Sequence, residues 1–214
     1  MNRVVLSDMD LVLLNKYREN CSYDQRGEIL HLGFNDFTFL GIKKYNFFTI
    51  KNANTINMPK LEETYSLEAS KAKYVNLPSL IKAHDITLTS ATRIDMPVLK
   101  NVRDMEMQFF YGDIDFPELE NCDTLNFNSA KTVNLPKLNF FQTIYCRNAR
   151  IIKIPNIYTA NSFGKIYVGK AEKIIVPKYF LRSCLRNLKQ DCEIIYLDEK
   201  KTNNESFKSF FYNK

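Results

Sequence analysis

The chain has 214 residues and a formal net charge of +6. Its length and its hydrophobic content of 45% suffice for one sizeable domain. No apolar run approaches the length of about 18 residues that a membrane-spanning helix requires. Acidic residues within the first ten positions exclude a secretory apolar segment there. We therefore expect a cytoplasmic protein with no membrane partner, located in the host cytoplasm if a phage or virus encodes it.

Residues 1–47 show no internal repeat and are predicted to form an N-terminal cap. Residues 4–18 mix apolar and charged side chains, and are interpreted either as a helix or as a strand followed by a short helix. Residues 27–32 and 37–42 have the composition of strands. A stack of repeats needs such a cap, because its first coil would otherwise expose its core and an unpaired strand edge.

Residues 48–179 repeat a six-residue stretch whose clearest copy is VNLPKL at positions 133–138. All seven prolines of the chain stand at the fourth position of a copy, and successive prolines lie 19 to 22 residues apart: Pro59, Pro78, Pro97, Pro117, Pro136, Pro155 and Pro177. Self-similarity at a period near 20 predicts a solenoid, in which each repeat forms one coil of a stack.

Each repeat also carries an earlier pair of apolar residues, such as Ile144 and Cys146, which alternate with polar residues as in a short strand. Two short strands joined by corners fit a coil of this length. Strands of successive coils would then pair in parallel, about 4.8 Å apart. Proline directly after the second strand would end its ladder, because proline has no N–H. The predicted fold is mainly β, a right-handed parallel β-solenoid of about seven coils.

A small residue lies three positions before each copied stretch, where a larger side chain would spread the stack. The fourth unit departs from this rule, since Tyr111 stands at that offset after two phenylalanines. The other six units have alanine there: Ala53, Ala72, Ala91, Ala130, Ala149 and Ala171.

Residues 180–214 are predicted to complete the domain as a C-terminal cap with a polar tail. Apolar residues recur at spacings of three and four over residues 178–190, which is the pattern of an amphipathic helix, and Pro177 stands just ahead of it. Residues 193–197 are predicted to be a final strand. Residues 198–214 are polar with an aromatic cluster, and are either a frayed tail or a docking peptide.

The Ile-x-Ile-Pro stretch, the alanine before it and the earlier apolar pair resemble the leucine-rich repeats of the BspA type, also called the Treponema pallidum type. The resemblance covers about residues 48–180. This chain departs from that family in its shorter period and in lacking most of the Ala-Phe and Cys-x-x-Leu features. The resemblance implies a solenoid of leucine-rich-repeat type that ends in a helix. It also implies a binding scaffold, often on cell surfaces, without a fixed enzymatic activity.

The sequence contains no motif of a catalytic, metal or cofactor site. It has no phosphate-binding glycine loop, no H-E-x-x-H and no G-x-S-x-G. We expect a protein that is not an enzyme and that holds no cofactor or metal. The cysteines form no C-x-x-C pair, and are interpreted as buried thiols in a reducing compartment rather than as ligands or nucleophiles: Cys21, Cys122, Cys146, Cys184 and Cys192.

Two outward rows of side chains are predicted along the stack. Asn57, Asn76, Asp95, Asp115 and Asn134 share one slot, and such a repeated polar type is interpreted as a structural ladder. The other row varies in type, as a recognition surface allows: Ser66, Thr87, Glu106, Asn126, Tyr145 and Tyr167. Tyrosine and arginine are enriched in interface hot spots. The predicted partner-binding residues are therefore Glu106, Asn126, Tyr145, Arg147, Lys165 and Tyr167.

The leading functional hypothesis is an intracellular scaffold that binds or occludes a protein partner through one sheet face. A composition rich in Asn, Lys and Tyr suits an AT-rich genome, and a phage-encoded inhibitor of a host or defence protein is one concrete form. A BspA-like structural or adhesive surface protein is the first alternative. The second is a nucleic-acid binder that uses the basic residues 170–214, where ten Lys or Arg residues face six acidic ones.

Overall fold

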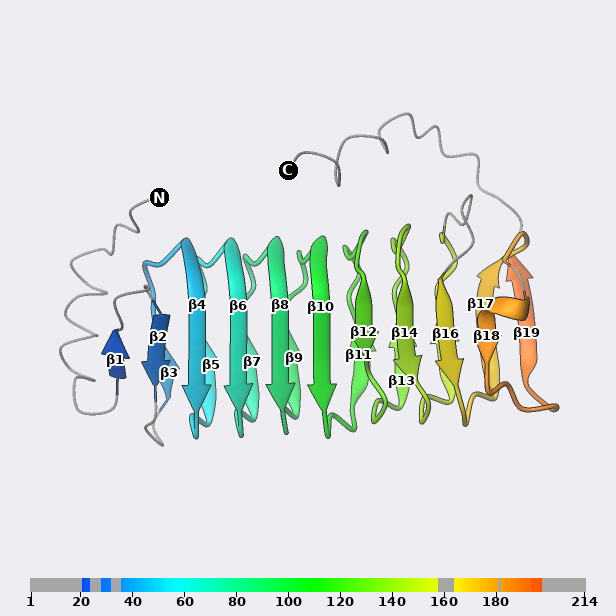
Figure 1. The fold of residues 1–214 in the computed structure, drawn as a ribbon, viewed down its shortest axis with the longest axis horizontal. Coiled ribbons are helices and arrows are strands. Elements are labelled where there is room, and N and C mark those ends of the chain that lie inside the picture. The colour runs from blue at the N-terminus through cyan, green and yellow to red at the C-terminus, as the bar shows by residue number, and fades with distance from the viewer. Residues whose placement is uncertain (1–20, 24–27, 32–35, 158–163, 181, 198–214) are drawn as a thin grey trace, which may run out of the picture.

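The computed structural model describes residues 21–23, 28–31, 36–157, 164–180 and 182–197, and the side chains from residue 36 onward. Within these residues the chain forms a β-solenoid of about eight turns, seen from the side in Figure 1. The predicted solenoid is therefore confirmed. The predictions for residues 4–18 and for the tail 198–214 lie outside the described residues.

The coils build one broad sheet and two narrow ones. The broad sheet has ten strands, in the order β1 (Cys21–Tyr23), β2 (Glu28–His31), β4 (Lys44–Lys51), β6 (Glu63–Ser70), β8 (Lys82–Thr89), β10 (Asn101–Gln108), β12 (Thr124–Asn126), β14 (Thr143–Cys146), β16 (Lys165–Val168) and β18 (Leu185–Arg186). One narrow sheet contains β3 (Phe37–Thr38), β5 (Thr55–Asn57), β7 (Tyr74–Asn76) and β9 (Arg93–Asp95). The other contains β11 (Asp113–Asp115), β13 (Thr132–Asn134), β15 (Ile151–Lys153), β17 (Lys173–Pro177) and β19 (Glu193–Leu197).

Residues one sequence period apart pair with each other in these sheets. Phe48 of β4 pairs with Leu67 of β6, one repeat later, and Ile144 of β14 pairs with Ile166 of β16. Neighbouring described strands are parallel except for β1 and β2, which pair antiparallel. Because β2 and β3 pair in parallel with β4 and β5, the stack begins one coil earlier than the predicted residue 48.

The core lies between the broad and narrow sheets and consists of the apolar residues that the repeat predicts. The predicted column on the narrow side is in register as Ile56–Val75–Ile94 and again as Ile114–Val133–Ile152. Five of these residues are at most 2% exposed, and Ile94 is partly buried. Each coil buries its apolar face only against its neighbours, which is why stacking supplies the stability.

Five of the prolines occupy the second position of tight turns. In the second copied stretch the N–H of Leu80 donates to the carbonyl of Leu77 at 3.1 Å, across Pro78 and Ser79. The same bond closes the turns at Leu61, Leu99, Leu119 and Leu138. Pro177 differs, because its own carbonyl accepts from the N–H of Phe180. Proline favours this position because its ring holds φ near the value that the turn requires. The predicted role of proline in ending the strand is confirmed at these five positions, with the turn as its mechanism. At Pro177 the prediction is wrong, because Pro177 is the last residue of β17 and pairs with Leu197.

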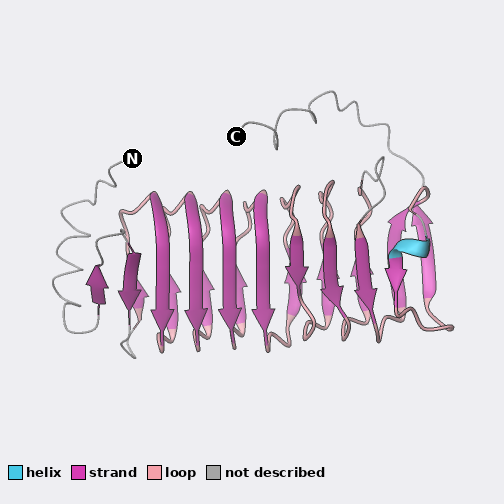
Figure 2. Ribbon diagram, viewed as in Figure 1, coloured by secondary structure: helices cyan, strands magenta, loops and turns pink. Residues whose placement is uncertain are grey.

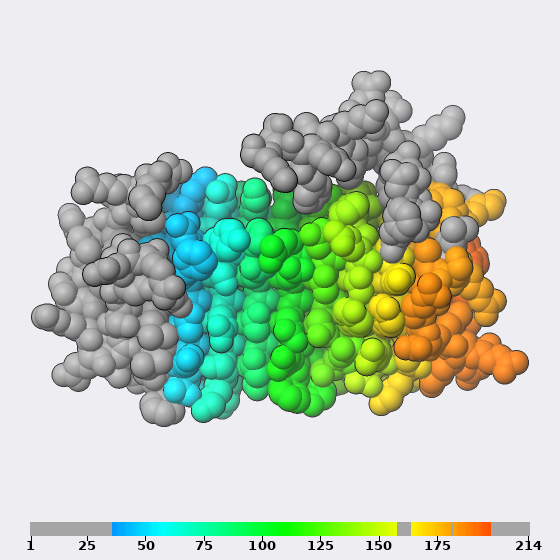
Figure 3. Space-filling view, viewed as in Figure 1, coloured from blue at the N-terminus to red at the C-terminus, as the bar shows by residue number. Residues whose placement is uncertain are grey.

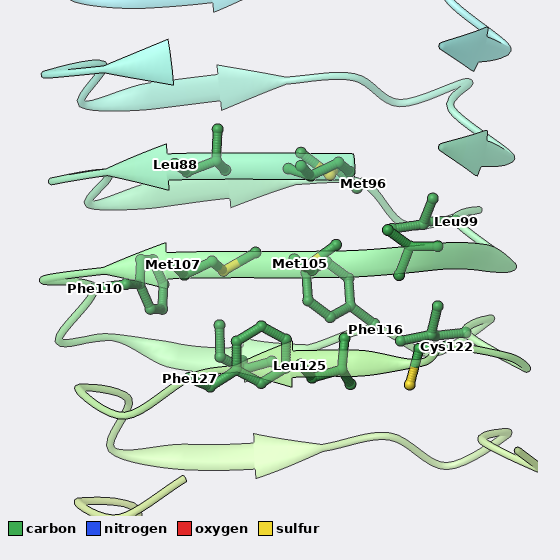
Figure 4. Packing of buried hydrophobic residues seen from close by; sticks show 14 of the residues in the cluster. Leu88, Met96, Leu99, Met105, Met107, Phe110, Phe116, Cys122, Leu125 and Phe127 are labelled. Atoms are coloured by element: carbon green, nitrogen blue, oxygen red, sulfur yellow. The ribbon is translucent and has the colours of Figure 1, made fainter. Parts of the chain in front are cut away.

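The turn after β10 is one residue longer than the three before it, and this corrects the prediction for Tyr111. Phe109 has a φ of 58°, and it therefore matches Asn52, Lys71 and Ser90, whose φ values are 66°, 66° and 70°. Phe110, which is 5% exposed, consequently stands where the other coils have alanine, and Figure 4 shows it beside Met107 and Phe127. Tyr111 is instead 63% exposed. This longer turn coincides with the break between the two narrow sheets, since one ends at β9 and the other begins at β11.

The C-terminal cap differs from the predicted amphipathic helix. Residues 182–184 form a single 3-10 turn, drawn beside β18 in Figure 2. The spacing of three and four arises because Phe180 closes a proline turn and Leu185 joins the broad sheet opposite Ile166. Coil corners and a helix can produce the same short apolar spacing. The predicted strand at 193–197 is confirmed as β19.

Candidate functional site

The outer face of the broad sheet carries most of the predicted binding residues, and it faces the viewer in Figure 3. Strand register forms one row along the stack: Thr49, Glu68, Thr87, Glu106, Asn126, Tyr145, Tyr167 and Arg186. The assignment of Ser66 to this row was wrong, because Ser66 pairs with Asp85 in the neighbouring row. Ala69 is buried and completes the apolar pair with Leu67, which leaves Glu68 between them facing outward.

Tyr145 and Tyr167 stack on each other across two coils. Their ring centroids are 4.7 Å apart and their planes differ by 17°. The guanidinium carbon of Arg147 lies 5.9 Å from the Tyr145 centroid and 6.0 Å from the Tyr167 centroid. Parallel in-register strands bring like side chains into contact, and a cation near aromatic rings is attracted by their electrons. We call Tyr145, Arg147, Lys165 and Tyr167 the aromatic–basic patch.

The backbone of Arg147 is held by three neighbouring residues. Its N–H donates to Oδ1 of Asn128 at 3.3 Å, and its carbonyl accepts from the N–H of Lys170 at 2.7 Å. A Cβ atom at Gly169 would lie 2.6 Å from that carbonyl oxygen, so only glycine permits this approach. The side chain of Arg147 remains exposed. The fold therefore fixes the backbone of Arg147 and leaves its guanidinium exposed to solvent.

Glu106 and Asn126 continue the row toward the N-terminus, but polar neighbours already engage them. Oε1 of Glu106 accepts from Nε2 of Gln108 at 2.9 Å and from Nδ2 of Asn126 at 3.4 Å. Lys165 is exposed in the adjacent row, two residues before Tyr167. The six predicted site residues therefore share one face, with the four of the patch over β14, β16 and the turn after β14.

A second cluster on this face was missed by sequence reasoning. The rings of Tyr65 and His84 stack with centroids 4.2 Å apart, and Nδ1 of His84 lies 3.1 Å from Oδ2 of Asp85. Arg103 lies 2.9 Å from Asp85 and 2.8 Å from Asp104. We call Tyr65, His84, Asp85, Arg103 and Asp104 the acidic network, because it contains two carboxylates and one arginine, which contacts both of them.

The acidic network exists because each strand turns two consecutive residues outward. His84 and Asp85 lie between Ala83 and Ile86, which are both buried. Simple alternation does not allow for such a pair. One sequence signal could have revealed this outward pair. A further position recurs at 19- and 20-residue spacing with mixed residue types, and all of its members are buried in the structure: Tyr45, Thr64, Ala83, Val102, Cys122 and Phe141.

Asp123 extends the acidic network by one coil. Burial raises the pKa of its carboxyl above the ordinary value, and the charge of Asp104 raises it further. A hydrogen bond from Gln142 and the charges of Arg103 and His84 act in the opposite direction. The ionised form of Asp123 is therefore disfavoured, at the end of the network nearest the aromatic–basic patch.

The slot on the narrow side forms the predicted ladder at two places. Nδ2 of Asn76 donates to Oδ1 of Asn57 at 2.7 Å, and Nδ2 of Asn134 donates to Oδ1 of Asp115 at 2.8 Å. These bonds join successive coils, as expected for side chains with a structural role. The amides therefore have partners within the stack.

Among the described residues no three His, Cys, Asp or Glu side chains are grouped to hold a metal ion. Cys122, Cys146 and Cys184 are buried, in agreement with their interpretation as small apolar residues, while Cys192 is partly buried. Burial raises the pKa of the Cys146 thiol to about 12, so it is protonated at neutral pH. The side chain of Cys21 lies outside the described part of the chain.

No family model matches the chain, and neither a curated protein nor a solved structure matches it. Within the described residues, no helix has the length and apolar character needed to cross a membrane.

Proposed function

We propose that this chain is a non-enzymatic interaction protein that binds a protein partner through the aromatic–basic patch. The observation that supports this most directly is the Tyr145–Tyr167 stack with the guanidinium of Arg147 beside both rings. Stacked rings are rigid, so a partner gains large contact area while little side-chain freedom is lost. The planar guanidinium adds directional donors for a carboxylate or carbonyl of the partner.

Two features favour a protein over a nucleic acid on this face. The tyrosine rings cover part of each other's faces, whereas stacking of a nucleobase needs an open ring face. Asp85, Asp104 and Asp123 lie on the same sheet face and would repel a phosphate backbone. A protein can match the positive patch and the acidic network with complementary charges.

The finer form of this proposal is an intracellular scaffold related to the BspA-type leucine-rich repeats. A phage-encoded inhibitor that occludes a host or defence protein is the concrete version that we propose. The buried, protonated thiols of Cys122 and Cys146 are compatible with a reducing compartment.

The test compares partner capture by the wild type and by Tyr145→Ala/Tyr167→Ala. Thr49→Ala/Thr87→Ala is the matched control, since both threonines lie in the same outward row. Capture is performed from host lysate in about 0.5 M salt, which screens non-specific charge attraction. We expect one protein to be retained by the wild type and the control and lost by the patch variant, and its binding to be reproduced by titration calorimetry with purified components. A partner that the patch variant binds equally well, or retention of salt-sensitive nucleic acid alone, would overturn the proposal.

A further inference from the structure

The solenoid carries very different charge on its two long edges. The turns that follow the broad-sheet strands form the lower edge in Figure 1, which we call the basic edge: residues 51–55, 70–74, 89–93, 108–113, 127–132, 146–151 and 168–173. They contain nine basic residues and two acidic ones, a net charge of +7. Six turns of the opposite edge contain six basic and four acidic residues, a net charge of +2: residues 40–44, 59–63, 78–82, 97–101, 117–121 and 136–140. The last described turn on that side adds the basic residues Lys178 and Arg182.

Backbone hydrogen bonds align the cations of the basic edge. The N–H of Arg150 donates to the carbonyl of Lys131 at 2.8 Å, and the N–H of Lys131 donates to the carbonyl of Gly112 at 2.9 Å. The N–H of Lys73 donates to the carbonyl of Asn54 at the same point of an earlier coil. With coils about 4.8 Å apart, seven coils make a row roughly 29 Å long.

Most cations of the basic edge have no acidic partner among the described residues, whereas glutamates pair with three of the six cations counted on the opposite edge. Both acids of the edge are engaged, Asp113 by the hydroxyl of Thr132 and Glu172 by Arg150. Five exposed lysines have no acidic partner among the described residues: Lys51, Lys71, Lys73, Lys131 and Lys170. On the opposite edge glutamates pair with Lys43, Lys44 and Lys137.

Two aromatic side chains project near the middle of the basic edge. Phe109 is 56% exposed and Tyr111 is 63% exposed, and both belong to the turn with the extra residue. Phe109 also has a left-handed backbone, which is unfavourable for a residue with a bulky side chain. The solenoid core gains little from either exposed ring, so packing among the described residues does not account for them.

Although the sequence alone predicted no membrane partner, we propose that the basic edge binds the surface of a membrane that contains anionic lipids. Lysines attract anionic headgroups, and aromatic rings favour the interfacial region between headgroups and acyl chains. A straight row of turns with one aromatic projection suits a plane. A single nucleic-acid strand is instead expected to use a groove with aromatic platforms repeated along it.

This inference goes beyond the proposed partner binding and would orient it. With the basic edge on the membrane surface, the broad sheet is oriented roughly perpendicular to the bilayer and lies outside it. The outer face of that sheet remains open to a protein. Arg147 belongs both to the edge and to the aromatic–basic patch, which places the patch at the membrane side of that face.

The experiment measures cosedimentation of the full chain with phosphatidylcholine vesicles and with vesicles that also contain phosphatidylserine. Lys71→Ser/Lys73→Thr removes two cations from the edge and copies the residues of the next coil, Ser90 and Thr92, so folding should persist. Lys60→Ser/Lys100→Asn is the matched control, because it removes two cations from the opposite edge and also copies equivalent residues, Ser79 and Asn139. Phe109→Asn/Tyr111→Ser removes the projection, and circular dichroism verifies the fold of every variant.

We expect binding to the phosphatidylserine vesicles, weakened by salt, that falls about tenfold or more for the lysine variant. Binding should also fall for the aromatic variant and remain within about twofold for the control. Equal binding to both vesicle types, no binding, or an equal loss in the control would overturn the proposal. The proposal would also be overturned if the wild type bound a labelled single-stranded oligonucleotide and did not bind vesicles. Tyr145→Ala/Tyr167→Ala should still bind vesicles, so failure of the partner proposal is distinguishable.

Discussion

A Cβ atom added to Gly112 would lie 2.7 Å from Cζ of Phe110 and 3.0 Å from its Cε1. The two residues therefore depend on each other. Phe110 fills the corner where other coils have alanine, and its ring occupies the space that a side chain at position 112 would need. The larger residue and the absent side chain together let the fourth coil close with one extra residue.

Gly112→Ala is expected to lower the free energy of unfolding by about 1 to 3 kcal/mol, because it overpacks this corner. In Phe110→Ala the ring is absent, and adding Gly112→Ala to that variant should then cost far less. Urea unfolding of the two single variants and the double variant measures this coupling. Additive losses would show that the ring and the glycine are independent.

Phe109→Asn is expected to raise the free energy of unfolding by about 0.5 to 1 kcal/mol, since asparagine tolerates a left-handed backbone better than phenylalanine. Asn52 already occupies the equivalent position with a φ of 66°. Phe109→Ala is the control, because it removes the ring without relieving the backbone. Thermal melting that ranks alanine above asparagine would contradict this explanation.

Leu135→Asp is expected to prevent folding or cause aggregation, because Leu135 is 0% exposed and the new carboxylate would be buried without a partner. Lys137→Ser, two residues later, removes only an ion pair with Glu118 on the surface. That pair is half-exposed, so its loss should cost less than about 1 kcal/mol. Soluble yield and melting temperature distinguish the two variants, and similar behaviour would mean that the buried and exposed positions of residues 135–137, which follow β13, are misassigned.

Asp123→Asn is expected to raise the melting temperature at neutral pH and to have no effect in acid. The folded protein raises the pKa of this carboxyl above its ordinary value of 3.8, so the folded state binds the proton more tightly than the unfolded state. Stability from this group is therefore present below pH 3.8 and is lost as the pH rises through the folded-state pKa. Asparagine does not ionise and avoids that loss. A lower melting temperature for the variant at neutral pH would show that the attraction of Arg103 outweighs burial.

The sequence by itself determined the stack and its register. Period and proline position repeat in seven successive units, and each coil contacts only its neighbours, so a local pattern is sufficient to place Ile56 beside Val75 and Tyr145 beside Tyr167. The six predicted site residues could be assigned to one face for the same reason. Leu67 followed by Ala69 was a weaker apolar pair than the others, and this is why Ser66 was placed in a row that belongs to Glu68.

Only the tertiary structure decided how the irregular turns pack. Whether Phe110 or Tyr111 enters the corner depends on space left by Gly112, which no period encodes. The apolar spacing around Phe180 and Leu185 fits both a helix and two coil corners, and pairing with Ile166 selects the corners. The acidic network and the basic edge also emerged only in three dimensions. Their residues are scattered through repeats that contain 17 basic and 13 acidic residues, and stacking is what gathers like charges on one edge.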